Sequence, residues 1–139
     1  MALTDAGAIA LAAAIMGDIT VDVFSNGNAA LGVGDDSTAF SADQTELEAE
    51  GASAGESLRK GMDGGYPSRD PDDDGSTNKI RFRATFGNSE ANFDWAEWGI
   101  FNDDTDGGGV MLNRVVESFG TKTSDDSWIL EIDFMVSAE

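Results

Sequence analysis

The run DPDDDG holds the residues whose types and spacing come closest to a known binding chemistry. Asp70, Asp72 and Asp74 alternate and precede Gly75, as in the first half of a calcium loop, where alternate carboxylates surround a hard cation. The twelfth position of an EF-hand loop is a bidentate Glu, but here it is Arg81. No helices are expected on either side, so the sequence excludes an EF-hand. A calcium site of another kind at Asp70, Asp72 and Asp74 is the alternative to a solvated acidic loop, and we expect no other cofactor.

The absence of histidine and cysteine excludes many catalytic classes. A Ser-His-Asp triad, a thiol nucleophile and the usual zinc sites all need one of these residues. Pairs of carboxylates could serve a glycosidase, but an acid-rich surface supplies such pairs by chance. We therefore expect no catalytic residues and a protein that is not an enzyme.

The charge balance of this chain of 139 residues is strongly acidic, with 27 Asp and Glu against 8 Lys and Arg and a net charge of -19. Soluble domains of this size carry a net charge of about 2 to 8 in magnitude, and greater like charge opposes folding. Molar salt shortens the Debye length to about 3 Å and removes most of that repulsion. The eight Phe and three Trp argue against disorder as the reason for the charge. The composition predicts a halophilic host and, because cations are scarce, no nucleic-acid partner.

Three of the eight cations lie on one predicted strand, Lys79–Phe86. Its apolar face consists of Ile80, Phe82, Ala84 and Phe86, and its other face of Lys79, Arg81, Arg83 and Thr85. If the last strand lies beside it, Glu131 and Asp133 face the two arginines and form cross-strand ion pairs. The alternative is a basic docking face for an acidic neighbouring subunit.

The elements that position these residues follow from sequence periodicity. Thr4 or Asp5 can cap a helix that runs to about Met16 and ends at Gly17. We expect residues 1–17 to attach to or clamp a neighbour. The apolar run is too short to cross a bilayer and follows no basic residue, so we expect neither membrane insertion nor a signal peptide.

Residues 18–139 are expected to form one β-sandwich domain. Alternating and apolar runs predict six strands, at Ile19–Phe24, Ala30–Gly34, Lys79–Phe86, Phe93–Phe101, Met111–Phe119 and Trp128–Val136. Short spacings between the later strands favour antiparallel pairing. The predicted fold class is mainly β, an antiparallel and jelly-roll-like β-sandwich with one N-terminal α-helix and a long acidic loop at 61–78.

Trp95 and Trp98 lie three residues apart on one predicted strand and should face opposite sides of its sheet. At least one of them then belongs to the core. Exposed Trp can also stack on sugars, so a sugar-binding platform is the alternative.

Five stretches that cover nearly the whole chain resemble small structural proteins of tailed viruses, of the tail-fibre, collar or capsid-surface kind. These are LTDAGAIALAAAIMGD, ALGVGDDSTAFSADQTEL, SLRKGMDGGYPSR, IRFRATFGNSEANFDWAEWGIFN and GGGVMLNRVVESFGTKTSDDSWILEIDF. The resemblance implies an all-β module that self-associates in a virion and has no catalytic residues to carry over. Additional Asp in the loops fits a virus of a halophilic host. Because the sequence ends at Glu139, soon after the last strand, we do not expect the distal tip of a long fibre.

The sequence thus predicts a virion structural protein on the particle exterior, made in the host cytoplasm and assembled as a homo-oligomer, such as a trimer or pentamer, with other virion proteins. The expected interface residues are Phe93, Trp95, Trp98, Phe101, Arg81, Arg83 and Arg114. The alternative function is an adhesion module that binds a host receptor, a surface glycan or the S-layer through the loop at 62–78 or an exposed Trp.

Overall fold

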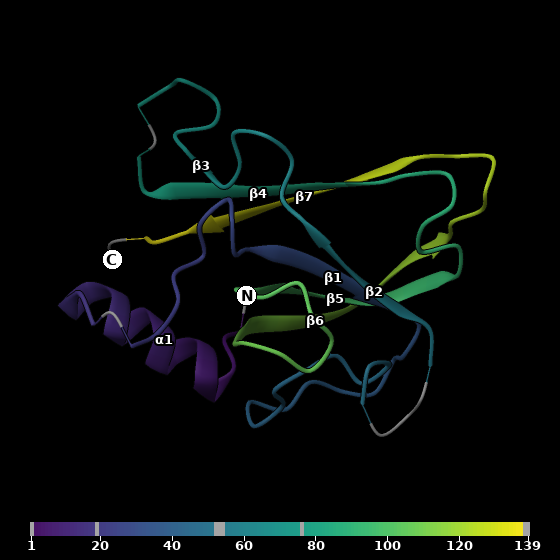
Figure 1. Cartoon of the computed structure of the whole chain (residues 1–139), viewed down its shortest axis with the longest axis horizontal. Helices are drawn as coiled ribbons and strands as arrows, with labels where there is room; N and C mark the ends of the chain where they lie inside the picture. The colour runs from purple at the N-terminus through teal and green to yellow at the C-terminus, as the bar shows by residue number, and fades with distance from the viewer. Residues whose placement is uncertain (1, 19, 52–54, 76, 138–139) are drawn as a thin grey trace.

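Two antiparallel β-sheets and one helix form the chain in the computed structural model, which describes residues 2–18, 20–51, 55–75 and 77–137 (Figure 1). The elements are α1 (Asp5–Met16), β1 (Ala30–Gly34), β2 (Ser57–Gly61), β3 (Ser68–Arg69), β4 (Lys79–Phe86), β5 (Asp94–Phe101), β6 (Met111–Thr121) and β7 (Trp128–Met135). This arrangement confirms the prediction of a mainly β, antiparallel sandwich with one N-terminal helix.

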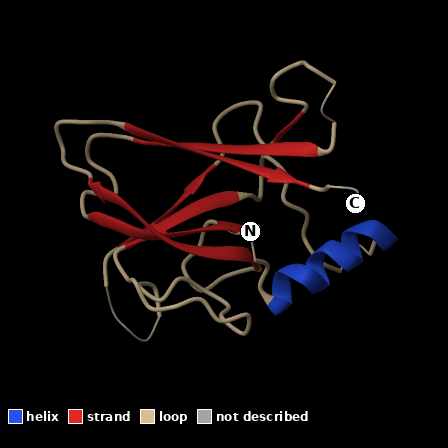
Figure 2. Cartoon of the chain, turned by 180° about the vertical axis from the view of Figure 1, so that it is seen from behind, coloured by secondary structure: helices blue, strands red, loops and turns tan. Residues whose placement is uncertain are grey.

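The strands divide into a four-stranded sheet with the order β2-β1-β5-β6 and a three-stranded sheet with the order β3-β4-β7. Figures 1 and 2 show the two sheets as layers, with α1 at one end and a connection of the chain beneath the four-stranded sheet. This connection is formed by residues 35–51. The inner sheet faces therefore form one core, and the outer face of the four-stranded sheet is also covered.

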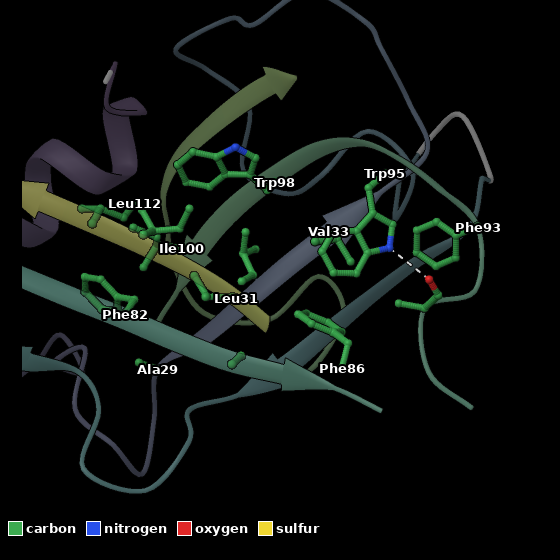
Figure 3. Packing of buried hydrophobic residues seen from close by; sticks show 14 residues of the cluster. Ala29, Leu31, Val33, Phe82, Phe86, Phe93, Trp95, Trp98, Ile100 and Leu112 are labelled. Atoms are coloured by element: carbon green, nitrogen blue, oxygen red, sulfur yellow. Dashed lines mark hydrogen bonds between the residues drawn. The ribbon is translucent and has the colours of Figure 1, made fainter. Parts of the chain in front are cut away.

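The main core lies between the sheets because their inward positions are apolar. Phe82 and Phe86 of β4 face Leu31 and Val33 of β1 across the sandwich (Figure 3). Trp95 donates its indole N–H to the carbonyl of Ala91 at 3.0 Å, so its one polar group is satisfied in the core. The rings of Phe86 and Trp128 pack against the Trp95 ring in edge contacts, with centroid distances of 4.9 and 5.0 Å.

Helix α1 begins and ends as its sequence predicts. The Thr4 hydroxyl accepts the N–H of Gly7 and donates to the carbonyl of Met111, so the N-cap also joins the helix to β6. Gly17 ends the helix in the left-handed region at a φ of 68°. A Cβ atom at Gly7 would lie 2.2 Å from the carbonyl oxygen of Leu112, so only glycine allows this close docking.

The predicted strand at Ile19–Phe24 is wrong for residues 20–24, which form no strand, while Ile19 lies outside the described residues. Asp18 accepts hydrogen bonds from the N–H and the hydroxyl of Thr20, which turns the chain after α1. The carbonyl of Asp22 accepts a hydrogen bond from the Asn102 side chain rather than from a neighbouring strand. An alternating pattern makes a strand only where a sheet edge is available to pair with it.

Two short strands were not predicted. In β2, Leu58 packs against the core while Arg59 is buried on the other face, and one apolar residue among polar neighbours gives no visible alternation. In β3, two residues within the predicted loop 61–78 pair with β4. Both strands depend on the sheets that they join.

Trp95 and Trp98 both lie in the main core, so the prediction that they face opposite sides is wrong. Trp95 pairs with Gly120 and Glu97 pairs with Val116, so three residues of β6 face one residue of β5. This bulge changes the alternation along β5 and brings the two indoles to the same face. The other face of β5 then carries Glu97.

Candidate functional site

Helix α1 has two apolar faces, one packed against the fold and one exposed to solvent. Its face of small residues, Gly7, Ala10 and Ala13, is buried in the fold. Among its exposed side chains are Ala8, Ile9, Ala12, Ile15 and Met16, at the i, i+1, i+4, i+7 and i+8 positions of one helix face. We call these five residues the apolar helix face.

The exposure of this face is large for apolar side chains. Ile9 is 67%, Ile15 87% and Met16 85% exposed. Residues 6–17 carry no charged side chain, although the whole chain has a net charge of -19. Contiguous exposed apolar residues on a soluble protein mark a surface that another molecule covers. The apolar helix face is therefore the first candidate binding surface.

A groove at the open side of the sandwich is the second candidate surface. It has a volume of about 640 Å³, and apolar side chains from β5, β6 and β7 line it, namely Trp95, Phe119, Trp128, Leu130 and Ile132. β6 and β7 are the edge strands of their sheets on this side. Phe119 is 40% exposed here, so part of the aromatic lining is open to a partner. We call this the β6–β7 groove.

The basic face of β4 forms the predicted ion pair of Arg81 with Asp133, whereas Glu131 lies 3.9 Å from Arg81 and forms no ion pair with Arg83 within the described residues. Arg81 pairs in register with Asp133, and Arg83 with Glu131. The Arg81 guanidinium donates from Nε to Asp133 Oδ1 at 2.7 Å and from a terminal nitrogen to Oδ2 at 3.0 Å. This bidentate contact holds the pKa of Asp133 below its usual value.

The remaining cations of β4 also have acidic partners in the same chain. Lys79 donates to Asp72 at 2.9 Å. Arg83 lies 3.1 Å from a carboxylate oxygen of Asp63, and its guanidinium stands over the Tyr66 ring with 5.5 Å to the centroid. The geometry thus favours a role within the fold, while docking of a neighbouring subunit stays a prediction.

Reversing the charge of Arg81 distinguishes the two roles. We expect Arg81→Glu to lower the melting temperature by a few degrees, because it places like charge opposite Asp133, and to leave assembly unchanged. Adding Asp133→Arg should restore the melting temperature, since the pair is then formed in the opposite orientation. Thermal denaturation and light scattering measure the two effects. Loss of assembly at an unchanged melting temperature would instead identify the basic face as an interface.

The calcium candidates do not gather into one site. The Asp70 carboxylate accepts the backbone N–H groups of Asp74 and Gly75 at 3.1 Å, and Asp72 binds cations of β4. Within the described ranges, no group of three or more carboxylates is arranged to hold a metal ion. The calcium hypothesis gains no support from this geometry, which uses Asp70 and Asp72 to order the loop.

A buried ion pair fastens the segment 35–51 to the outer face of the four-stranded sheet. Arg114 donates from Nε to Glu97 at 2.5 Å, and both side chains are 0% exposed. Glu97 also accepts the N–H groups of Glu48 and Ala49 at 3.1 and 2.9 Å. Burial raises the pKa of Glu97 although these donors oppose the shift. Arg114 additionally donates to the carbonyl of Thr38 at 2.8 Å, which connects both ends of the segment to the pair.

A second buried pair lies beside the first. Arg59 donates to the two oxygens of Glu50 at 2.7 and 2.9 Å and stands 3.7 Å above the centre of the Phe101 ring. It also donates to the carbonyls of Asp103 and Gly108. Sequence reasoning expects Arg114 to pair with an acidic group but does not identify Glu97, and it misses the pair of Arg59 with Glu50. No local pattern distinguishes these carboxylates from the many exposed ones.

The predicted interface residues divide by exposure. Five of them are buried within the chain, with exposed fractions of 8% or less, namely Phe93, Trp95, Trp98, Phe101 and Arg114. They pack the fold and offer little surface to another subunit, and neither Trp95 nor Trp98 can stack on a sugar. Arg81 and Arg83 are partly exposed, and their part in an interface stays a prediction.

Comparison with family models, curated proteins and solved structures gives no match for this chain. Within the described ranges, the structure contains no helix with the length and apolar character needed to span a membrane. The surfaces of the chain itself and its sequence motifs therefore indicate its function.

Proposed function

We propose that this chain is a non-enzymatic structural protein on the exterior of a tailed virus, and that it assembles into a symmetric homo-oligomer in the high salt of a halophilic host. It would serve as a tail, baseplate or collar component, or as a turret or decoration of the capsid. The observation that carries the proposal is the apolar helix face, which is exposed on an otherwise acidic chain. The sequence motifs that resemble virion proteins are the reason for proposing a virus particle as the assembly.

The electrostatics explain why a helix with a single charged residue, Asp5, suits contact between copies. Two copies of a chain with a net charge of -19 repel each other in dilute salt. Molar salt screens this repulsion over about 3 Å, while apolar burial does not depend on opposite charges. Contact through the apolar helix face therefore buries a surface whose one acid, Asp5, lies in the first turn of α1, and it leaves the acidic loops in solvent.

The sandwich supplies a rigid frame for such contacts. Both faces of the four-stranded sheet are covered, one by the main core and one by the segment 35–51. The buried ion pair of Glu97 and Arg114 joins that segment to β5 and β6 through hydrogen bonds to Thr38, Glu48 and Ala49. A rigid frame keeps the docking surfaces in fixed relative positions, as a symmetric particle requires.

Charged substitutions on α1 test the proposal. We expect the wild-type chain to form a defined oligomer in molar KCl, and Ile9→Glu/Ile15→Glu to remain monomeric in the same buffer. The two substitutions place charge on an exposed surface without removing a core contact. Light scattering after gel filtration gives the mass, and incorporation into particles gives the function.

Substitution is preferable to deletion of residues 2–16, because Thr4 contributes hydrogen bonds to β6. A matched control is Val136→Glu, which adds a charge at a side chain that is 63% exposed and lies outside both candidate surfaces. The control should assemble as the wild type does. An Ile9→Glu/Ile15→Glu variant that assembles normally would refute the role of the helix.

A further inference from the structure

We infer that the apolar helix face of one copy docks into the β6–β7 groove of the next copy. The inference rests on the proposed self-assembly and names the surface that receives the helix. The apolar helix face is convex and the groove is concave, and both are open in the single chain.

Helix α1 and the connection from β6 to β7, beside which the groove begins at Trp128, lie at opposite ends of the sandwich (Figures 1 and 2). Helix α1 is anchored at the start of β6, where Gly7 contacts Leu112, whereas Phe119 near the end of β6 borders the groove. At the rise of a strand residue the two places are on the order of 20 Å apart along β6. The chain cannot place its own helix in its own groove, because its N-cap bonds hold α1 at the far end.

The dimensions of the two surfaces correspond. The helix has 12 residues and is about 18 Å long. The groove follows β7 from Trp128 to Ile132, which spans about 13 Å in an extended strand. An amphipathic helix typically fills such a groove with side chains at i, i+3, i+4 and i+7 spacing. Ile9, Ala12 and Met16 have this spacing on the apolar helix face, and the flexible thioether of Met16 suits an aromatic lining.

The charge pattern favours this occupant over other parts of the chain. The groove has Glu131 at its margin, so an acidic segment would meet like charge there. Residues 6–17 carry no charged side chain, and one side of this segment, the apolar helix face, is exposed, with Asp5 at its N-terminal end. The equally long uncharged run at 23–34 includes β1, which is buried in the middle of the four-stranded sheet.

A contact between two different surfaces has a definite consequence for assembly. Each copy offers one helix and one groove, so every copy can bind one neighbour on each side. Such heterologous contacts close into a ring when the rotation between neighbours divides a full turn. Pairing of two identical helix faces would instead end at a dimer.

Mixing two defective variants tests the inference. The helix variant is Ile9→Glu/Ile15→Glu, which keeps its groove, and the groove variant is Phe119→Glu, which keeps its helix. We expect each variant alone to be monomeric in molar KCl, with a dissociation constant at least tenfold above that of the wild type. The equimolar mixture should form a one-to-one heterodimer, because one intact helix can enter one intact groove. Native mass spectrometry and light scattering measure the stoichiometry.

Three outcomes are decisive beyond the expected one. A groove variant that forms the wild-type oligomer overturns the inference and leaves the proposed self-assembly intact, since the helix then binds elsewhere. A folded groove variant that loses binding to a host glycan but assembles normally identifies an adhesion groove and also overturns it. A wild-type chain that stays monomeric at every KCl concentration refutes the proposed function itself.

The groove variant needs a check on folding, because the Phe119 ring contacts Trp95 with a centroid distance of 6.5 Å. Its near-ultraviolet circular dichroism should match that of the wild type. If Phe119→Glu does not fold, Phe119→Ala takes its place and should weaken assembly in the same direction. Unchanged assembly of folded Phe119→Ala would then contradict the inference. Val136→Glu is again the control, with an expected oligomer equal to that of the wild type.

Discussion

Replacing Arg114 with Met is expected to lower the free energy of unfolding by about 3–5 kcal/mol, since it leaves a buried carboxylate without its charged partner. Glu97 is 0% exposed and has its Arg114 contact at 2.5 Å. The backbone donors of Glu48 and Ala49 remain in the variant but carry no full positive charge. Urea unfolding in molar KCl measures the loss, and it should be accompanied by faster hydrogen exchange at these two amides.

Two further variants test whether the loss of stability comes from the ion pair of Glu97 with Arg114. Glu97→Gln/Arg114→Met removes both charges and should recover part of the lost stability, because a neutral pair requires no charge compensation. Arg69→Met changes an exposed arginine of β3 and should leave the free energy of unfolding unchanged. If Arg114→Met costs no more than Arg69→Met, the buried pair does not hold the segment 35–51 on the sheet.

The melting temperature of the wild-type chain is expected to rise by on the order of 10 °C between about 0.1 M and about 3 M KCl. A net charge of -19 on 139 residues makes repulsion within the folded state a cost of several kcal/mol in dilute salt, and screening removes most of it. Salt also weakens the exposed ion pairs of β4, which have the opposite dependence. The expected rise means that repulsion among the acids exceeds these attractions.

A variant with fewer acidic residues shows whether KCl raises the melting temperature by screening the repulsion among carboxylates or by a general effect on protein stability. Four exposed loop aspartates change to Asn in this variant, at Asp104, Asp106, Asp125 and Asp126. It should melt higher than the wild type in dilute salt, and the two melting temperatures should converge in molar KCl. An equal rise for both proteins would contradict an electrostatic origin, and no rise in the wild type would contradict the halophilic adaptation.

Local patterns were enough to predict α1 and the strands β4 and β7, while the pairing of these two strands enters the sequence analysis only as a condition. The cap at Thr4 and the end at Gly17 depend on neighbours within one turn of the helix. The period of two along β4 and β7 places apolar residues on one face and charged residues on the other. The register that puts Arg81 opposite Asp133 is set by the structure. These elements are predictable because few long-range choices are needed to form them.

The strand expected at residues 20–24 and the missed strand β2 show where local patterns fail. The first has an alternating sequence without a strand beside it, and the second has a polar sequence that joins an available sheet edge through β1. Similarly, the bulge in β5 decides the faces of Trp95 and Trp98 through its pairing with β6. Each of these features is set by a partner that is distant in the sequence.

The sequence by itself determined the mainly β class, the capped apolar helix, the excluded His and Cys chemistry and the excess of acid. Each of these follows from composition or from spacing within a few residues. Only the tertiary structure decided which acids are buried, which aromatic residues line the β6–β7 groove and which face of α1 stays exposed. The physical reason is that burial depends on packing between distant segments: Gly7 determines the inner face of α1 by its contact with Leu112, and Glu97 becomes buried only where Arg114 and the segment 35–51 meet.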